Sequence, residues 1–486
     1  MNLAAPPVRS FARGTVSRDA AWSLAYSAVV RLATLAASVV LARMIGPSGT
    51  GAFGVALQVT ALGSMLATFN LPQSLSRHLA STEDPARRHR LLRTSGWLLL
   101  GLSTLTGTAL MALSSWLARS VYHVPELAPV LFWCGPLVIA TSATSWVEGA
   151  LQGLRRFSSL TLWGVLVSVL DLTLGSLAAA FGVVWVLVSR SMIRALAAAG
   201  AVARWFRGAP AGTSPGTFAS TAAPLLGFAG PTLLATATVL ATQTVLRLLL
   251  VRSSALVAAG QYQAADSIAQ GLSLIPTAAS IAFMRSVAMG AEAGYPGLAV
   301  SLRRGLERLA GSNLPLCLLL MGVLPWATVA LFGHEFTRSR PVLVLLSASY
   351  GLQGPSALFG AAILGRGEVW TGAFLNLMWA GVVLGAFTLA GAPLGAVGAA
   401  IAMLSGYFVL LVVCALALAP RWSVPLKSLA PAILATVGSL ALGCSLALTP
   451  GVPPLVTALV CVALAGAVAV RWGLPAISSA ARGAGD

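Results

Sequence analysis

The chain has 486 residues, of which 57% are hydrophobic and only 9% are charged, and its formal net charge is +18. A soluble domain is about 25% charged, so this composition excludes a soluble globular protein and indicates an all-α protein that crosses the membrane many times. The arginines stand in short gaps between apolar runs rather than on long solvated surfaces. This pattern argues against nucleic acid as a partner and is the one that sets membrane topology.

The five cysteines indicate neither a metal site nor a cofactor. Each lies inside an apolar run, without the close pairing that metal and redox motifs show, so we expect small core residues. They are Cys134, Cys317, Cys414, Cys444 and Cys461. The basic N-terminus leads into an apolar run too long for a signal peptide, and we expect this run to be retained as the first span.

Taking roughly 20 apolar residues per crossing, we predict about fourteen transmembrane helices. A six-helix lobe covers residues 1–206, a polar cytoplasmic linker 207–221, and a second six-helix lobe 222–420, while residues 421–486 add two helices and a short cytoplasmic tail. The spans are expected near 20–43, 51–77, 94–117, 128–151, 159–180, 182–203, 222–251, 262–287, 306–332, 341–364, 369–390, 394–418, 426–448 and 453–472.

The basic residues give the orientation. With a cytoplasmic N-terminus, the inner segments collect most of them: Arg87, Arg88, Arg90, Arg93, Arg155, Arg156, Arg204, Arg207, Arg303, Arg304, Arg308, Arg421 and Lys427. The outer loops hold Arg43, Arg119, Arg252, Arg338 and Arg340. Because positive charge marks cytoplasmic loops, we predict that both termini are cytoplasmic. No outer loop exceeds about a dozen residues, which leaves no room for a folded catalytic domain.

The first two spans meet at a turn that we interpret as a motif and a gate. Gly46 and Pro47 interrupt the apolar run, since a helix cannot easily continue there. Gly230 with Pro231, and the glycine-rich segment 391–398, are further bending points. Plain helix packing is the alternative role of these residues.

The two lobes resemble each other. Three positions of the first lobe, Arg43, Gly51 and Arg77, recur at nearly constant spacing as Arg252, Gly260 and Arg285. Such self-similarity is typical of a duplicated transporter. Because both halves begin on the cytoplasmic side, we predict a parallel repeat of two lobes around a central cavity.

Two pairs of opposite charges lie inside predicted spans at matching depths. Asp171 and Arg190 are almost equidistant from the turn near residue 181, and Arg247 and Asp266 from the turn near residue 256. Each pair is either a structural ion pair or part of an ion-coupling site. We expect Glu148 to be a solvated charge near the cytoplasmic interface.

The remaining intramembrane arginines are candidates for contact with an anionic head group. Arg31 finds no carboxylate at its depth in the second span, so we expect it to face a water-filled cavity or an anionic ligand, with a partner on a distant helix as the alternative. Arg194 is the next candidate, because Arg190 is assigned to Asp171. We predict Arg31, Arg194 and Arg247 as head-group contacts, since phosphate in a low-dielectric cavity needs such donors.

Five stretches of the chain, in order, resemble motifs of the oligosaccharide (polysaccharide) flippase family. They are LARMIGPSGTGAFG at 41–54, LPQSLSR at 71–77, ALQGLRRF at 150–157, LFGHEF at 331–336 and GAVGAAIA at 395–402. This Wzx-like family belongs to the MOP superfamily, together with MATE drug exporters and peptidoglycan lipid flippases. The resemblance spans roughly residues 20–420.

The resemblance implies fourteen helices and alternating access between inward-open and outward-open states. It further implies a plasma (inner) membrane protein that moves polyprenyl-diphosphate-linked oligosaccharide to the outer leaflet for surface polysaccharide assembly. Its partners would be the bilayer, this anionic lipid-linked cargo and other polysaccharide-assembly membrane proteins. We therefore expect a transporter and not an enzyme.

Two other functions stay open at this point. A cation-coupled MATE-type exporter of drugs or small solutes has the same architecture, but it favours intramembrane carboxylates. An integral-membrane polymerase or glycosyltransferase needs acidic or histidine residues on outer loops. The outer loops offer His123 with Glu126 and His334 with Glu335, which we interpret as solvated loop residues.

Overall fold

The computed structural model describes residues 13–82, 84–206, 218–289 and 297–473. These residues form helices and no strands. The chain divides into two compact units, Met1–Thr244 and Val245–Asp486, and each is described by itself. The division falls within helix α7 (Phe218–Ala269). Most of the predicted linker at 207–221 lies outside the described residues.

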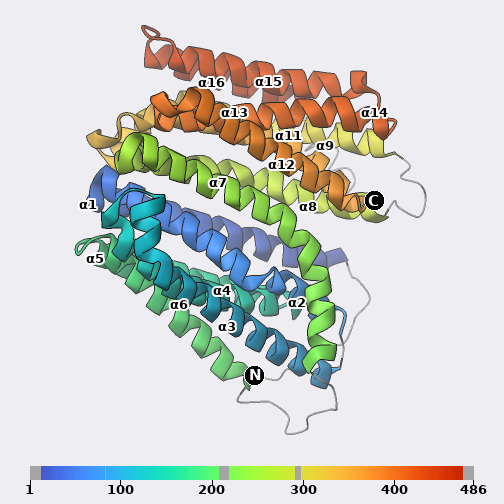
Figure 1. Cartoon of the computed structure of the whole chain (residues 1–486). Coiled ribbons are helices and arrows are strands. Elements are labelled where there is room, and N and C mark those ends of the chain that lie inside the picture. The colour runs from blue at the N-terminus through green and yellow to red at the C-terminus, as the bar shows by residue number, and fades with distance from the viewer. Residues whose placement is uncertain (1–12, 83, 207–217, 290–296, 474–486) are drawn as a thin grey trace. The chain divides into compact units, whose positions relative to one another are not determined.

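The first unit is an apolar bundle of six helices and the start of α7, labelled in Figure 1. Its helices are α1 (Arg13–Thr68), α2 (Leu71–Ala80), α3 (Pro85–Trp116), α4 (Ala128–Gly153), α5 (Phe157–Ala179) and α6 (Val183–Phe206). Helix α4 packs on both α3 and α6, and α1 packs on α5. Small residues allow this closeness: a Cβ added at Gly135 of α4 would lie 2.5 Å from the carbonyl oxygen of Gly107 on α3.

The second unit is organised around α11, most of whose residues are buried. Its helices after α7 are α8 (Leu274–Met289), α9 (Leu298–Gly322), α10 (Leu324–Phe332), α11 (Ser339–Gly365), α12 (Val369–Ala386), α13 (Ala396–Val413), α14 (Ala419–Arg421), α15 (Leu426–Leu448) and α16 (Pro454–Val468). Helix α11 contacts α8, α9, α13 and α15. The last two long helices, α15 and α16, both pack on α9.

Every predicted span has a helical counterpart. Eleven helical stretches are long and apolar enough to cross a membrane, and α9 with α10, bent by 61°, makes a twelfth. Two of the eleven, Tyr26–Thr68 and Thr236–Met284, contain a break and each covers two predicted spans. The prediction of an all-α polytopic membrane protein is confirmed.

The breaks in α1 and α7 have the same backbone conformation. Gly46 has φ 65° and ψ −176°, and Ala255 has φ 62° and ψ 175°. Gly46 lies three residues after Arg43, and Ala255 lies three residues after Arg252. The turn predicted at Gly46 is therefore present, and it recurs at the position that the proposed repeat requires.

A second contact also recurs between the units. Gly153 at the end of α4 lies against α2, where an added Cβ would be 2.8 Å from the Cβ of Leu79. Gly365 at the end of α11 lies against α8, where the corresponding distance to Val287 Cβ is 2.8 Å. After each glycine the chain makes the same hydrogen-bonded turn. These shared contacts support the internal duplication inferred from the arginines.

The two breaks make opposite substitutions informative. A non-glycine residue at φ near +60° with extended ψ costs about 1–3 kcal/mol, so Ala255→Gly is expected to raise the free energy of unfolding and Gly46→Ala to lower it. The midpoint of thermal unfolding of the purified protein measures both. Ala36→Gly, at an exposed helical position of α1, is the matched control and should lower stability by about 0.5–1 kcal/mol. An Ala255→Gly variant that loses as much as this control would contradict the assignment.

A charged cluster joins the turn before α12 to the segment after α13. Arg366 Nε donates to Glu368 Oε1 at 2.8 Å, and Trp422 Nε1 donates to the same oxygen at 3.3 Å. Arg421 Nη2 lies 3.5 Å from Glu368 Oε2. Partial burial opposes ionisation of Glu368, but these donors outweigh it and hold the pKa of the carboxyl group below its ordinary value of 4.5.

This cluster predicts a pH-dependent stability. A folded pKa below the unfolded one means that the ionised carboxylate stabilises the fold above pH 4.5 and loses this contribution as the pH falls below it. Glu368→Gln should therefore lower the unfolding midpoint at neutral pH, and the difference from wild type should shrink in acid. Glu307→Gln, in an exposed ion pair with Arg303, should change little. A Glu368→Gln difference that is constant with pH would contradict the account.

Candidate functional site

A polar cavity of about 210 Å³ lies inside the first unit, between α1, α4, α5 and α6. One face of α1 supplies Val30, Ala33 and Ala37, spaced three and four residues apart as on a single helix face. The lining also carries an unusual density of ionisable groups for a membrane helix bundle: Tyr26, Glu148, Asp171, Arg190 and Arg194. Ionisable residues at membrane depth are costly and mark functional sites by default.

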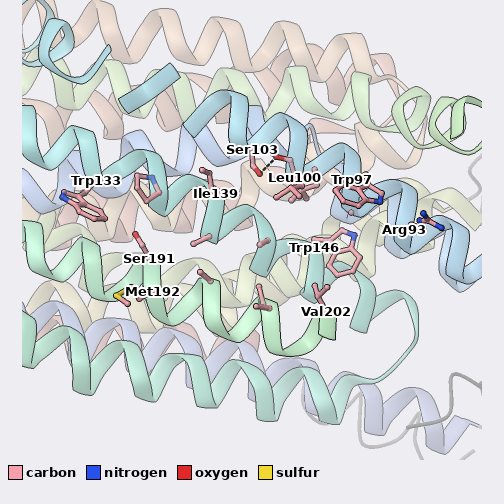
Figure 2. A pocket seen from close by; sticks show the side chains of 18 residues that line it. Arg93, Trp97, Leu100, Ser103, Trp133, Ile139, Trp146, Ser191, Met192 and Val202 are labelled. Carbon is pink, nitrogen blue, oxygen red and sulfur yellow. Dashed lines mark hydrogen bonds between the residues drawn. The ribbon is translucent and has the colours of Figure 1, made fainter. Parts of the chain in front are cut away.

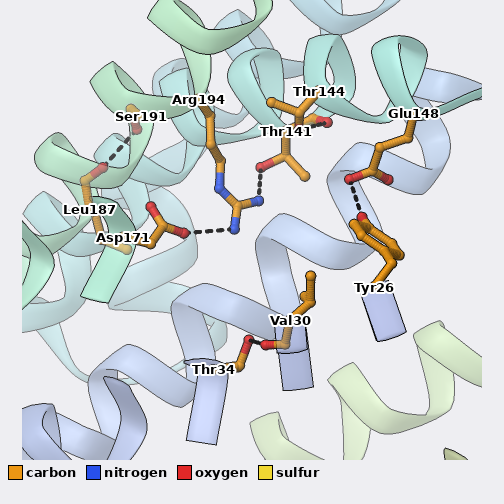
Figure 3. A network of polar contacts seen from close by, with 10 residues as sticks. All are labelled: Tyr26, Val30, Thr34, Thr141, Thr144, Glu148, Asp171, Leu187, Ser191 and Arg194. Atoms are coloured by element: carbon orange, nitrogen blue, oxygen red, sulfur yellow. Dashed lines mark hydrogen bonds and ion pairs between the residues drawn. The ribbon is translucent and has the colours of Figure 1, made fainter. Parts of the chain in front are cut away.

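Arg194 of α6 is the best-placed cation in this cavity (Figure 3). Its Nη2 lies 3.2 Å from Asp171 Oδ2 on α5, and its Nη1 donates to Thr141 Oγ1 on α4 at 3.2 Å. Farther along α4, Glu148 Oε1 accepts a hydrogen bond from Tyr26 Oη of α1 at 2.9 Å. The guanidinium group is thereby held in place at the cavity wall by two neighbouring helices.

Arg190 lies one helical turn before Arg194 and also lines the cavity. Its guanidinium carbon lies 4.9 Å from the centroid of the Phe53 ring, a cation–π contact. Four buried polar atoms of this wall have no hydrogen-bond partner among the described residues. They are Nε of Arg190, Nε of Arg194, Oδ1 of Asp171 and Nε1 of Trp163. Buried polar groups are normally paired, so this wall has hydrogen-bonding capacity left for water or a ligand.

The predicted ion pair between Asp171 and Arg190 is wrong in its partner. Among the described residues Asp171 pairs with Arg194, and equal distance from the turn was a poor guide. Side chains on a helix tilt toward its N-terminus, so Asp171 on α5 leans away from the turn while Arg194 on α6 leans back toward it. Asp171 therefore pairs with Arg194, which lies one helical turn farther from the α5–α6 turn than Arg190 does.

Glu148 also differs from its prediction. We expected a solvated interfacial charge, but the side chain is only partly exposed and faces the cavity. The ring of its partner Tyr26 packs directly against Gly164 on α5, where any added Cβ would overlap the ring. Sequence reasoning missed Tyr26 and Trp163 altogether. The sequence does contain a signal for Tyr26: it lies four residues before Val30, and this spacing puts both side chains on the cavity face of α1.

The predicted pair of Arg247 and Asp266 in the second unit is confirmed, with Nη2 and Oδ2 2.8 Å apart. Asp266 also accepts hydrogen bonds from Gln270 Nε2 at 2.9 Å and Tyr350 Oη at 2.9 Å, and Arg247 also donates to Gln263. Both carboxylate oxygens are thus satisfied. This favours the structural role for the second pair, in contrast to Asp171 in the first unit.

The internal repeat extends to the aromatic partners of the buried arginines. Arg247 lies over the Tyr262 ring at 5.7 Å, as Arg190 lies over Phe53. Phe53 follows Gly46 by seven residues, and Tyr262 follows Ala255 by seven. Each unit therefore places an arginine on the aromatic residue that follows its helix break, but the arginine comes from α6 in one and from α7 in the other.

The other predicted site residues lie outside the cavity wall. Arg31 is half-buried on α1, next to Val30. Arg43 and Arg77 are exposed, Gly46 and Pro47 form the helix break, and Gly51 is buried just after it. Their roles as head-group contact and as gate stay predictions.

The sequence model of the family described as "Polysaccharide biosynthesis protein" matches residues 16–284, more than half of the chain. The chain belongs to the polysaccharide biosynthesis protein family. All five ionisable residues of the cavity fall within the matched region. No curated protein matches the sequence.

Several solved structures have the fold of this polysaccharide biosynthesis family member. The lipid II flippase MurJ, in an inward closed conformation, has a TM-score of 0.64 at 12% identity and covers 94% of this chain and 99% of its own. An inward-facing multidrug resistance MATE family transporter of the MOP superfamily has a TM-score of 0.63 at 17% identity, covering 82% and 95%. A MOP superfamily transporter from Pyrococcus furiosus has a TM-score of 0.58 at 16% identity, covering 85% and 96%. These likenesses establish the MOP transporter fold.

Proposed function

We propose that this protein is a flippase that moves polyprenyl-diphosphate-linked oligosaccharide from the cytoplasmic to the outer leaflet of the plasma membrane. Membership of the polysaccharide biosynthesis family supports the pathway, and the MOP fold supports transport by alternating access. The observation that carries the proposal is the cavity wall with Arg190 and Arg194, each of which has an unpaired Nε. Guanidinium groups bind phosphate in two-pronged geometry and keep their charge when buried.

In this mechanism the diphosphate enters the polar cavity while the polyprenyl tail stays in the bilayer. Arg194 supplies the first phosphate contact, because Asp171 and Thr141 hold its guanidinium group in place. Arg31 is a further head-group contact of the same proposal, and Asp171 and Arg190 are its candidate coupling groups. Arg247 and Asp266 of the second unit were predicted for the same two roles, but their mutual pairing favours a structural role instead. The proposal puts both termini in the cytoplasm, because the distribution of arginines along the sequence predicts that orientation.

A MATE-type exporter of cations is the second candidate. The observation that favours it is that the same cavity carries two carboxyl groups, Glu148 and Asp171, beside the aromatic rings of Tyr26 and Trp163. Carboxylates and aromatic faces recognise organic cations. The cavity thus carries groups that could bind an anionic or a cationic cargo, and a transport measurement distinguishes the two functions.

Reconstituted vesicles provide that measurement. The protein is placed in vesicles with a fluorescent polyprenyl-diphosphate oligosaccharide, and the fraction of label accessible to a membrane-impermeant quencher is followed over time. The flippase proposal expects fast exchange that requires the protein. Absence of exchange together with gradient-driven uptake of a cationic dye would replace it by the exporter.

The same assay tests the role of Arg31. If it contacts the head group, Arg31→Ala should abolish flipping while the protein still inserts, and Arg31→Lys should keep part of the activity, because the positive charge remains. Arg119→Ala, at an exposed position outside the predicted site, is the control. Normal flipping by Arg31→Ala would remove Arg31 from the site.

A further inference from the structure

A second and larger cavity lies in the first unit, between α3, α4 and α6, and it differs in chemistry from the polar site. It is a partly open groove of about 740 Å³ (Figure 2). Its walls are aliphatic and aromatic, and three tryptophans line it: Trp97, Trp133 and Trp146. Part of this lining is solvent-accessible in the isolated chain, since Trp97 is 60% exposed. The groove therefore offers an apolar, partly exposed surface suited to a hydrocarbon chain.

The groove is long and has one polar end. Figure 2 shows Arg93, Trp97 and Val202 at one end and Trp133 and Ser191 at the other. Between Ser191 and Val202 helix α6 rises ~16 Å at 1.5 Å per residue. A hydrocarbon core of ~30 Å has leaflets of half that depth, so the groove has the length of one leaflet.

The polar end carries the features of a membrane interface. Arg93 is exposed there, and Trp97 lies beside it, as tryptophan and arginine do at the boundary between hydrocarbon and head groups. Arg90 precedes Arg93 by three residues and so lies on the same face of α3. Its Nη1 is buried and has no hydrogen-bond partner among the described residues. Arg93 thus lines the end of the groove, and Arg90 lies one helical turn beyond it on the same face of α3.

We propose that this groove binds one anionic phospholipid of the cytoplasmic leaflet, with its phosphate at Arg93 and Arg90 and one acyl chain along α3, α4 and α6. Charge complementarity selects an anionic head group over a neutral one, and the one-leaflet length fits an acyl chain. The site is separate from the polar cavity and does not depend on the transported cargo. The bound lipid ties three helices of the first unit together.

Binding of phosphatidylglycerol to the purified full-length protein tests this site. Native mass spectrometry should show one phosphatidylglycerol molecule that stays bound to the protein under conditions that remove phosphatidylcholine. Phosphatidylglycerol should also raise the thermal unfolding midpoint more than phosphatidylcholine does. Arg93→Gln should weaken phosphatidylglycerol binding at least about tenfold, because a charge-assisted bond to phosphate is lost. Ala199→Phe, which fills the groove from α6, should weaken it without removing a charge. Arg87→Gln, at an exposed position of α3, should bind as wild type does.

Each other outcome overturns the proposal. Equal binding of the two phospholipids, or an Arg93→Gln variant that keeps its preference, would show that the groove has no anionic site. Displacement of phosphatidylglycerol by equimolar polyprenyl phosphate would assign the groove to the tail of the cargo instead. Because the readout is binding and not flipping, its failure is distinguishable from failure of the proposed function.

Discussion

Replacing Arg194 with glutamine is expected to reduce flipping of the lipid-linked oligosaccharide at least about tenfold. Arg194 is fixed at the cavity wall by Asp171 and Thr141, and its loss removes a charge-assisted contact of about 1.5–3 kcal/mol to phosphate. Arg194→Lys should keep part of the activity, since it retains the charge but not the planar donor geometry. The exchange assay in vesicles measures the rates of both variants.

The control must separate lost recognition from lost folding, because Arg194→Gln leaves Asp171 without its ion partner. The double variant Arg194→Gln with Asp171→Asn removes this unpaired charge. It should insert and accumulate as wild type does, and flip the lipid more slowly than Asp171→Asn alone, and this difference measures the loss that is due to Arg194. A double variant with normal flipping would show that Arg194 serves only to neutralise Asp171.

Asp266→Ala is expected to lower the free energy of unfolding by about 3–5 kcal/mol, the largest stability effect that the structure predicts. It leaves Arg247 as an uncompensated buried charge, which is strongly destabilising. It also removes the acceptor of the hydrogen bonds from Gln270 and Tyr350. Loss of the folded protein during heating in detergent measures the effect.

Two further variants define this result. Glu126→Ala removes an exposed carboxylate outside the helices of the membrane core and should change stability little. The double variant Arg247→Met with Asp266→Leu should recover stability, since a buried pair can be replaced by apolar side chains of similar volume. A tolerated Asp266→Ala variant would show that the pair is not structural and would reopen its coupling role.

The architecture was predictable because its signals are local. Apolar runs long enough to cross a bilayer give the spans, and Gly46 with Pro47 marks the break in α1. The break at Ala255 carries no local signal of its own, since alanine favours helix. The gap between the predicted spans 222–251 and 262–287 indicates a turn near residue 256, and the matching spacing of Arg43 and Arg252 in the two halves supports the position of the break.

The candidate site was only partly predictable because its contacts are not local. Arg247 and Asp266 lie on either side of one turn, and the sequence was enough to pair them. Tyr26 on α1 and Glu148 on α4 form a hydrogen bond although helices α2 and α3 separate them in the sequence, and no spacing rule links them. Asp171 pairs with Arg194 and not with Arg190, because the tilt of the side chains decides the partner, and not the distance of each residue from the turn.

The most direct test of the central claim is mass spectrometry of lipid extracts from cells depleted of this protein. The flippase account predicts that polyprenyl-diphosphate oligosaccharide accumulates and that its surface polymer is lost, with rescue by wild type but not by Arg194→Gln. The sugar composition of the accumulated lipid would also identify the cargo. Absence of accumulation, with new sensitivity to cationic drugs, would contradict the account and favour the exporter.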